Sequence, residues 1–134
     1  MAMFMQYQIL KNNEKVEKML MINEDLEDAL KKYIKLLKKE EYFKAHEVLE
    51  EGWHPLRLKK DPLANLVKGF INGAIAFEHI KRNKKNMPNK AKKVLASYER
   101  YKERVQTTTK HQYLFSEAKE ILEGLKKRHK AVFL

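Results

Sequence analysis

The sequence contains no cysteine among its 134 residues. This absence excludes disulfide bonds, thiol nucleophiles and metal sites built from thiolate ligands. Glycine and proline are also scarce, with four and three residues respectively, and this leaves few turn positions for a β-rich architecture. Leu, Lys, Glu and Ala are abundant instead, and all four favour helices. The composition therefore predicts a helical protein without thiol chemistry.

Long apolar runs are absent as well. No stretch approaches the roughly 18 consecutive apolar residues that a membrane-spanning helix needs. The opening residues, Met1 to Gln6, carry neither the basic segment nor the cleavage-type site of a secretion signal. We therefore expect a cytoplasmic protein with no membrane partner.

Length and composition predict one domain. A chain of 134 residues matches the usual size of a single domain. Hydrophobic residues make up 43% and charged residues 35%, which suffices for a core beneath a well-solvated surface. The predicted fold class is all-α: a single-domain bundle of about five helices over residues 1–134. Residues 24–105 form its principal helical unit and residues 114–130 its C-terminal helix.

The first 22 residues are the region where a strand competes with a helix. Met5, Tyr7 and Ile9 alternate with glutamines, which is the period of a strand. A polar turn could pair this segment with residues 16–22, so that residues 1–22 form a short β-hairpin extension. Two short helices are the alternative interpretation. An isolated hairpin is only marginally stable, so it would have to pack on the helices.

Helical periodicity begins after Asn23, which suits an N-cap position and is followed by acidic residues near the positive end of the helix dipole. Apolar residues then recur with a 3.6-residue period, and the predicted core stripe is Leu26, Ala29, Leu30, Tyr33, Ile34 and Leu37. A second helix follows, with the core stripe Tyr42, Ala45, Leu49, Trp53 and Leu56. Because proline disfavours helical geometry in the residue before it, this helix is predicted to end near His54-Pro55.

A third helix, predicted from Asp61-Pro62 to about Ile80, is apolar around most of its circumference. The Asp-Pro pair is a helix-start signal. A helix that is apolar on nearly all sides takes the central place in a bundle. Gly69 and Gly73 each cost roughly 1 kcal/mol relative to alanine in a helix interior. They therefore predict a neighbour packed closely against this backbone.

Two further helices are predicted after a polar loop at residues 83–89. The first runs from about Pro88 to Arg104, and its inward residues are Ala91, Val94, Leu95, Tyr98 and Tyr101. The last has Ser116 as its cap, and its core stripe is Ala118, Ile121, Leu122 and Leu125.

A histidine and a glutamate lie at the edge of the buried stripe of the second helix. His46 and Glu50 are four residues apart, which makes them neighbours on one helix face. Asn72 and His79 belong to a polar stripe on the third helix and could face them across the helix pair. An unpaired buried polar group costs about 1–3 kcal/mol. We therefore predict a polar cluster between the two central helices, composed of His46, Glu50, Asn72 and His79, with the indole of Trp53 as a further member.

The residues around this cluster resemble those of a known family. The first segment reads Ala45-His46-Glu47-Val48-Leu49-Glu50-Glu51-Gly52-Trp53, and the second reads Lys68-Gly69-Phe70-Ile71-Asn72-Gly73-Ala74, with His79 after it. They are similar to the helical bacterial and archaeal proteins grouped as domain of unknown function 309, whose motif is Ala-His-Glu-x-Leu-Glu-x-x-Trp. That family usually has glutamine in place of Asn72. The resemblance covers Tyr33 to about Tyr101, and it implies a compact all-helical fold and no particular activity.

The same segment invites comparison with the zinc-protease motif His-Glu-x-x-His. The second ligand position is Glu50 rather than histidine, so the protease motif is incomplete. A site could still be assembled from His46, Glu50 and His79, because nitrogen and carboxylate ligands suit zinc or iron. The protein would then be a metal- or small-ligand-dependent enzyme. Because only one helix offers paired ligands, we favour a site without a cofactor.

Other catalytic machinery is scarce. Ser97 and Ser116 are the only serines, and neither stands in a nucleophile-elbow context. The scattered glycines form no phosphate-binding loop. A binding or interaction role is therefore favoured over catalysis.

The net charge of +11 is unevenly placed along the chain. Residues 1–67 carry 12 basic and 12 acidic residues, whereas residues 68–134 carry 17 basic and six acidic ones. This excess predicts an acidic partner, and it raises nucleic-acid binding as an alternative function. The predicted basic patch consists of Lys81, Arg82, Lys84, Lys85, Lys90, Lys92 and Lys93. A merely solvated basic face is the competing interpretation.

Overall fold

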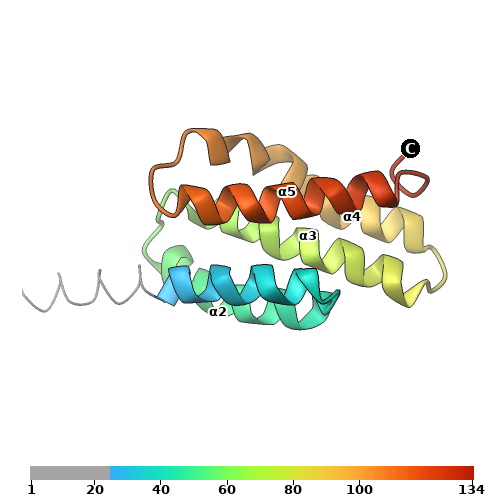
Figure 1. Ribbon diagram of the computed structural model, residues 1–134, viewed down its shortest axis with the longest axis horizontal. Coiled ribbons are helices and arrows are strands. Elements are labelled where there is room, and N and C mark those ends of the chain that lie inside the picture. Colours follow the sequence, from blue (N-terminus) through green and yellow to red (C-terminus); the bar gives the residue numbers. More distant parts are fainter. Residues whose placement is uncertain (1–24) are drawn as a thin grey trace, which may run out of the picture.

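The computed structural model describes residues 25–134 (Figure 1). It contains a helix over residues 25–38, followed by α2 (Tyr42–Leu58), α3 (Ala64–Arg82), α4 (Met87–Tyr101), the 3₁₀ helix η1 (Lys102–Gln106) and α5 (Gln112–Arg128). Because no strand occurs among these residues, the all-α prediction is confirmed. The hairpin expected at residues 1–22 lies outside the described residues. The division into a principal unit and a C-terminal helix within one domain stays a prediction.

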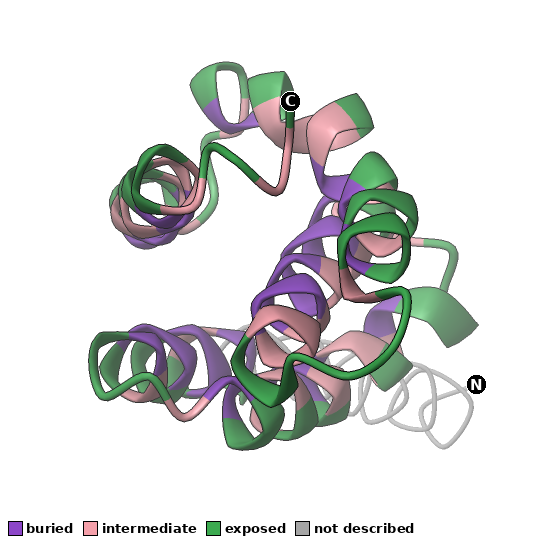
Figure 2. Cartoon of the chain, turned by 90° about the vertical axis from the view of Figure 1, so that its right-hand side faces the viewer, coloured by how far each residue is buried: buried purple, intermediate pink, exposed green. Residues whose placement is uncertain are grey.

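The central helix of the bundle is α3, as its nearly all-round apolar sequence predicts. In the end-on view of Figure 2 it passes between the other helices, whose buried residues face it. α2 and α4 pack along it, and α5 and η1 also contact it. Nine of its 19 residues are buried, so α3 supplies a large part of the core.

A cluster of aromatic rings surrounds Phe70 in the middle of α3. Its ring centroid lies 6.2 Å from that of Tyr33, 5.5 Å from Tyr98 and 5.7 Å from Phe115, which is the range of favourable edge-to-face and tilted pairs. All four residues are fully buried. The Tyr33 hydroxyl donates a 2.6 Å hydrogen bond to the Phe70 carbonyl, so its polar atom is satisfied inside the core. Burial raises the pKa of Tyr33 well above its usual value.

Two glycines allow neighbouring helices to approach α3 closely, as predicted. A Cβ atom on Gly69 would lie 3.2 Å from the Ser97 carbonyl oxygen and 3.2 Å from the Tyr98 Cα atom. A Cβ atom on Gly73 would lie 2.8 Å from Leu122 Cδ1. The contact at Gly69 is with the α4 backbone, which no side-chain rotation can relieve. Gly69 therefore sets the distance between α3 and α4.

The prediction that the second helix ends near His54-Pro55 is wrong, because α2 continues to Leu58 with Pro55 inside it. A proline there removes one backbone hydrogen bond and strains the preceding turn. Burial of Leu56, which is 2% exposed, compensates for this loss. The continued helix keeps Leu56 on the buried stripe of α2, which places its side chain in the core.

The observed bounds of the third and fourth helices also differ slightly from the predicted ones. α3 begins at Ala64, a little later than predicted. The Asp61 carboxylate accepts a 2.9 Å hydrogen bond from the backbone N–H of Leu63, so it stabilises the turn that leads into the helix. α4 ends at Tyr101 rather than at Arg104, because the chain tightens into η1.

The prediction of Ser116 as the cap of the last helix is wrong, because α5 begins at Gln112. The additional turn contains Leu114 and Phe115, both of which are buried. Helical geometry places these residues toward the same side as Ala118. The gain in apolar burial therefore decides where the helix begins.

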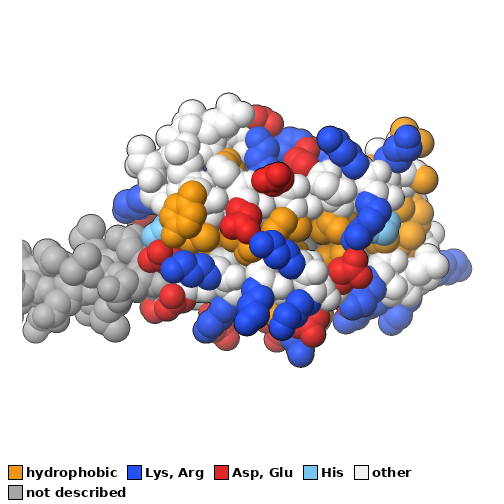
Figure 3. Space-filling view, viewed as in Figure 1, with side chains coloured by type: hydrophobic (Ala, Val, Ile, Leu, Met, Phe, Trp, Pro, Cys, Tyr) orange, Lys and Arg blue, Asp and Glu red, His pale blue; other side chains and the backbone are white. Residues whose placement is uncertain are grey.

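Polar bridges align α5 with the helix over residues 25–38 and with the turn after it. The bridges are Lys38–Glu117 (2.8 Å), Tyr113–Glu27 (3.2 Å) and Arg128–Glu40 (2.8 Å). Figure 3 shows an apolar strip (orange) running between rows of charged side chains on this face. Exposed ion pairs contribute only about 0–1 kcal/mol each, so burial of apolar surface holds α5 in place and the bridges set its alignment.

Between residues 25 and 134, none of the helices combines the length and the apolar character that crossing a bilayer requires. The expected cytoplasmic location goes further than this finding and stays a prediction.

Matched alanine substitutions at two helical glycines test the contact between α3 and α4. Gly124 has nothing within 4 Å of its Cβ position, so Gly124→Ala should raise the free energy of unfolding by about 1 kcal/mol through helix propensity. Gly69→Ala has the same propensity gain, but its methyl group meets the α4 backbone, and overpacking costs about 1–3 kcal/mol. We expect Gly69→Ala to be the less stable variant by that difference in equilibrium urea unfolding. Equal gains in the two variants would contradict the close contact.

Candidate functional sites

His46 and Glu50 are neighbours on α2, as their spacing predicts. The distance from His46 Nε2 to Glu50 Oε2 is 3.9 Å. His46 Nδ1 contacts the carbonyl oxygen of Phe43, and an acceptor there requires the proton on Nδ1. The neutral ring therefore presents a bare Nε2 to Glu50, and only the protonated ring forms an ion pair with it. The two side chains are 15% and 38% exposed, so the pair borders solvent.

Asn72 has a hydrogen-bond partner on α4. Its side-chain amide donates a 2.7 Å hydrogen bond to the Ser97 hydroxyl. His79 lies two helical turns further along α3, on the same stripe as Asn72. Lys68, one helical turn before Asn72 on this stripe, contacts the Trp53 ring of α2, so the stripe borders both α2 and α4. The grouping of Asn72 and His79 with the His46–Glu50 pair stays a prediction.

The predicted ligand set His46, Glu50 and His79 is not assembled as a metal site. Between residues 25 and 134 no group of three His, Asp or Glu side chains is placed to hold a metal ion. His46 and Glu50 remain as a pair on one helix, whereas zinc sites use at least three protein ligands. The described residues thus do not form the zinc or iron centre considered from the sequence.

Trp53, the remaining member of the predicted site, is bordered by cations. The Lys68 Nζ atom lies 4.4 Å from the centroid of the Trp53 ring, and the Arg57 Cζ atom lies 5.4 Å from it. Both distances are within the range of cation–π attraction. The partly buried indole thus connects the last turns of α2 with α3.

All seven residues of the predicted basic patch are exposed, but three of them have partners. The hydrogen bonds run from Lys81 to the Glu40 carbonyl (2.9 Å), from Arg82 to the Glu78 carboxylate (2.9 Å) and from Lys92 to the Leu134 carbonyl (2.7 Å). These three cations therefore form hydrogen bonds within the protein and are less available to a partner.

The other four residues of the patch, which we call the α3–α4 lysine cluster, are Lys84, Lys85, Lys90 and Lys93. No carboxylate in the described part of the chain forms an ion pair with any of them. Lys84 and Lys85 lie in the turn between α3 and α4, and Lys90 and Lys93 are one helical turn apart on α4. Figure 3 shows Lys and Arg side chains (blue) at this end of the molecule, on the right. The cluster is thus a solvated and uncompensated positive surface.

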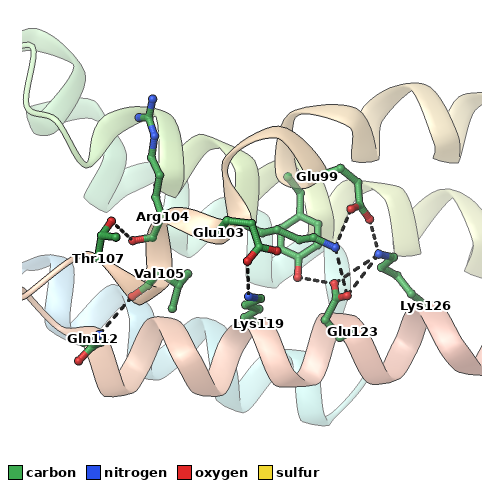
Figure 4. Close-up of polar contacts among 11 residues, drawn as sticks. Glu99, Glu103, Arg104, Val105, Thr107, Gln112, Lys119, Glu123 and Lys126 are labelled. Carbon is green, nitrogen blue, oxygen red and sulfur yellow. Dashed lines mark hydrogen bonds and ion pairs between the residues drawn. The ribbon is translucent and has the colours of Figure 1, made fainter.

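A polar network that the sequence predictions did not include joins α4, η1 and α5 (Figure 4). The Tyr98 hydroxyl donates a 2.7 Å hydrogen bond to Glu123 Oε2. Lys102 Nζ lies 3.2 Å from Glu123 Oε1 and 2.7 Å from Glu99 Oε2. Lys126 contacts the same two carboxylates. Charges of opposite sign therefore alternate along the seam between α4 and α5.

The network holds both of its glutamates in the charged form. Burial alone would raise the pKa of Glu123, but hydrogen bonds from Tyr98 and Lys102 and the charge of Lys126 outweigh burial and lower the pKa below its ordinary value of 4.5. Burial likewise opposes the charge of Glu99, and Lys102 and Lys126 again lower its pKa. Burial and the hydrogen-bonded Glu123 raise the pKa of Tyr98. At neutral pH these groups keep fixed charges, which suits a structural role.

Part of the signal for this network was present in the sequence. Glu99 and Lys102 are three residues apart, as are Glu123 and Lys126, and this is the spacing of neighbours on a helix. Each pair taken alone is a common surface feature. Their meeting depends on how α4 and α5 pack together, which spacing within one helix does not reveal.

Comparison with known proteins confirms the resemblance to the helical family. Residues 30–88 match the model of a family described as a domain of unknown function (DUF309). The matched region contains the His46–Glu50 pair, Trp53 and the glycines of α3. No curated protein and no solved structure gave a significant match. The family description assigns no activity.

The charged network predicts a loss of stability in acid. Because the pKa values of Glu99 and Glu123 are lowered by folding, their contribution to the free energy of unfolding is present above their unfolded pKa of about 4.5 and is lost as the pH falls through the lower folded values. Glu123→Gln removes one titrating carboxylate and keeps an acceptor for the Tyr98 hydroxyl. The stability of this variant should fall less steeply than that of the wild type from about pH 5 to about pH 3 in urea unfolding.

Glu120→Gln is the matched control for this measurement. Glu120 lies on the same helix, is exposed and forms no ion pair with any residue of the described chain. It should follow the pH dependence of the wild type. The same slope for Glu123→Gln and Glu120→Gln would argue against a special contribution of the network.

Proposed function

We propose that this protein binds nucleic acid through the α3–α4 lysine cluster. The observation that carries this function is the lack of any carboxylate partner within residues 25–134 for four exposed lysines close together. Lysines without acidic neighbours create a local positive potential, which attracts phosphate groups. Neutralising those phosphates releases counterions, and this release drives association.

The backbone at the turn between α3 and α4 also supports nucleic-acid binding. The first turn of α4 contains no acidic residue, and the positive end of a helix dipole favours anions. Asn83 and Asn86 adopt left-handed conformations, with φ values of 49° and 63°, which asparagine tolerates better than most residues. The chain therefore reverses direction within a short turn, and the positive charges of the turn and of α4 are concentrated at one corner.

His79 adds a further donor beside the cluster. The hydrogen bond from Asn72 to Ser97 sets the register of two antiparallel helices. Moving seven residues along each helix from that bond, in opposite directions, brings His79 of α3 level with Lys90 of α4. An imidazole N–H in this position can donate to a phosphate oxygen alongside the lysines.

Binding of this kind is expected to have little sequence preference. Lysine acts as a point charge toward phosphate, whereas base discrimination relies on planar, bidentate side chains such as Arg, Asn and Gln in a groove. The four lysines contact the backbone of the nucleic acid in this scheme, and phosphate contacts carry no sequence information. We place this activity in the cytoplasm, because a protein without cysteine has no disulfide bond that would require an oxidising compartment.

Charge removal within the cluster tests the proposed function. The triple variant Lys85→Gln/Lys90→Gln/Lys93→Gln should bind a short DNA duplex more weakly than the wild type in fluorescence anisotropy. Because each phosphate contact contributes about 0.9 to the slope of log affinity against log salt concentration, the slope should decrease by about 2 to 3. An RNA hairpin of the same length should show the same trend.

A control with the same net charge separates a local site from a general effect of charge. Lys32, Lys35 and Lys110 are exposed and form no ion pair within residues 25–134. They lie on the helix over residues 25–38 and ahead of α5, outside the cluster. Their triple glutamine variant should retain most of the affinity. Equal losses in both triple variants, or no binding by the wild type at low salt, would refute the proposed site.

A further inference from the structure

A cleft lies at the opposite end of α3 from the lysine cluster. The last turns of α2, the first turn of α3 and η1 meet there and enclose about 410 Å³, a volume within the range of roughly 300–1,000 Å³ typical of small-molecule sites. The lining includes Trp53, Arg57, Lys60, Asp61, Asn65 and Arg104. We call it the Trp53 cleft.

Three cations converge on the Trp53 cleft from separate parts of the chain. Arg57 comes from α2, Lys60 from the turn after it and Arg104 from η1. None of the three forms an ion pair within the described residues. The carboxylate in the lining, Asp61, is engaged by the backbone N–H of Leu63 at 2.9 Å. The cleft therefore has an excess of positive charge, which suits an anionic ligand.

Arg104 is placed to serve such a ligand. Figure 4 shows its side chain extending away from α5, in contrast to its neighbour Glu103, which contacts Lys119. The Arg104 Cζ atom lies 4.6 Å from the centroid of the Tyr101 ring, and this cation–π contact helps to fix the direction of the guanidinium group. A fixed guanidinium donates to phosphate oxygens with little loss of conformational entropy.

The backbone amide of Asn65 adds a donor at the same place. Asn65, in the first turn of α3, lines the Trp53 cleft together with Ala64, whose own N–H donates to the Asp61 carbonyl at 3.0 Å. The first N–H groups of a helix have no carbonyl partner within the helix, and the helix dipole is positive at this end. No acidic residue occupies the first turn. Side-chain cations and the amide of Asn65 thus act together on one small volume, in the way that phosphate sites are built.

An apolar pocket adjoins the cationic cleft. It encloses about 340 Å³ and is lined by Pro62, Leu63, Leu66, Arg104, Thr107 and Thr108. Pro62 and Arg104 line both hollows, so a single molecule can extend from one into the other. The partly buried Trp53 ring forms a wall of the cationic part. This combination is suited to a ligand with a phosphate at one end and a planar, less polar ring at the other.

We propose that the Trp53 cleft binds a small phosphorylated molecule that carries a ring, such as a nucleoside monophosphate. Its phosphate contacts Arg57, Lys60 and Arg104, and its ring lies against the adjoining apolar pocket. The site is separate from the nucleic-acid surface, because the 19 residues of α3 place its two ends roughly 28 Å apart. Loss of either site should leave the other intact.

The emission of Trp53 reports directly on this cleft, because it is the single tryptophan of the chain. A phosphate that draws Arg57 toward itself changes the surroundings of the indole, so AMP should produce a saturable change in fluorescence. Adenosine and inorganic phosphate each supply only one half of the ligand and should bind at least about tenfold more weakly. Isothermal titration calorimetry of the same three compounds provides the affinities without reference to fluorescence.

Arginine variants locate the phosphate within the cleft. Arg57→Ala and Arg104→Ala should each weaken AMP binding by about tenfold or more, because charge-assisted hydrogen bonds are lost. Arg100→Ala is the matched control, since Arg100 is exposed on α4 and does not line the cleft. It should bind AMP like the wild type, and so should the triple lysine variant of the α3–α4 cluster.

Three results would overturn this assignment. The first is the absence of both a saturable fluorescence change and binding heat with AMP. The second is equal affinity for AMP and adenosine, which would remove the role of the phosphate. The third is equal AMP affinity in Arg104→Ala and Arg100→Ala, which would place the ligand elsewhere. Because Arg57 and Arg104 are exposed, their replacement leaves the core unchanged and the comparison remains interpretable.

Discussion

The close approach of the α4 backbone to α3 at Gly69 is the constraint on which the rest of the bundle depends. It brings the Tyr98 ring against Phe70 and the Ser97 hydroxyl to the amide of Asn72. With α4 on one side and α2 on the other, α3 is enclosed along its length. The Asn72 amide is consequently used for helix packing, whereas the α3–α4 lysine cluster and the Trp53 cleft lie near the two ends of α3.

The seam between α4 and α5 differs from the two proposed binding surfaces in how its charges are compensated. Along the seam of α4 and α5, the lysines Lys102 and Lys126 contact Glu99 and Glu123, so the charges compensate one another. By contrast, the four lysines of the α3–α4 cluster and the three cations of the Trp53 cleft have no carboxylate partners within residues 25–134. Like charges close together repel, so such groups add nothing to folding stability. Their concentration at surfaces with helix N-termini and a cleft is the common basis of the two binding proposals.

The order and type of the helices could be read from apolar periodicity. The stripe predicted for the helix over residues 25–38 recurs among the buried residues, and so does the stripe of α5 except for Ile121, which is partly buried. An apolar residue every three to four positions can face a core in a helix. The errors fall at helix ends, near Pro55 and Ser116. Local signals favoured a break or a cap there, whereas burial of Leu56 and Phe115 outweighed them. Propensity terms are small beside the free energy of burying such a side chain.

Helix type, helix order and the neighbourhood of His46 and Glu50 followed from local spacing, since i and i+4 contacts depend on helix geometry alone. Tertiary structure decided everything that joins separate helices. It paired Asn72 with Ser97, gathered the network around Glu123, and brought Arg57 and Arg104 to one cleft. Those outcomes depend on which face of α3 each neighbour covers. The Gly69 contact determines that choice through three-dimensional packing, and no periodicity within a single helix encodes it.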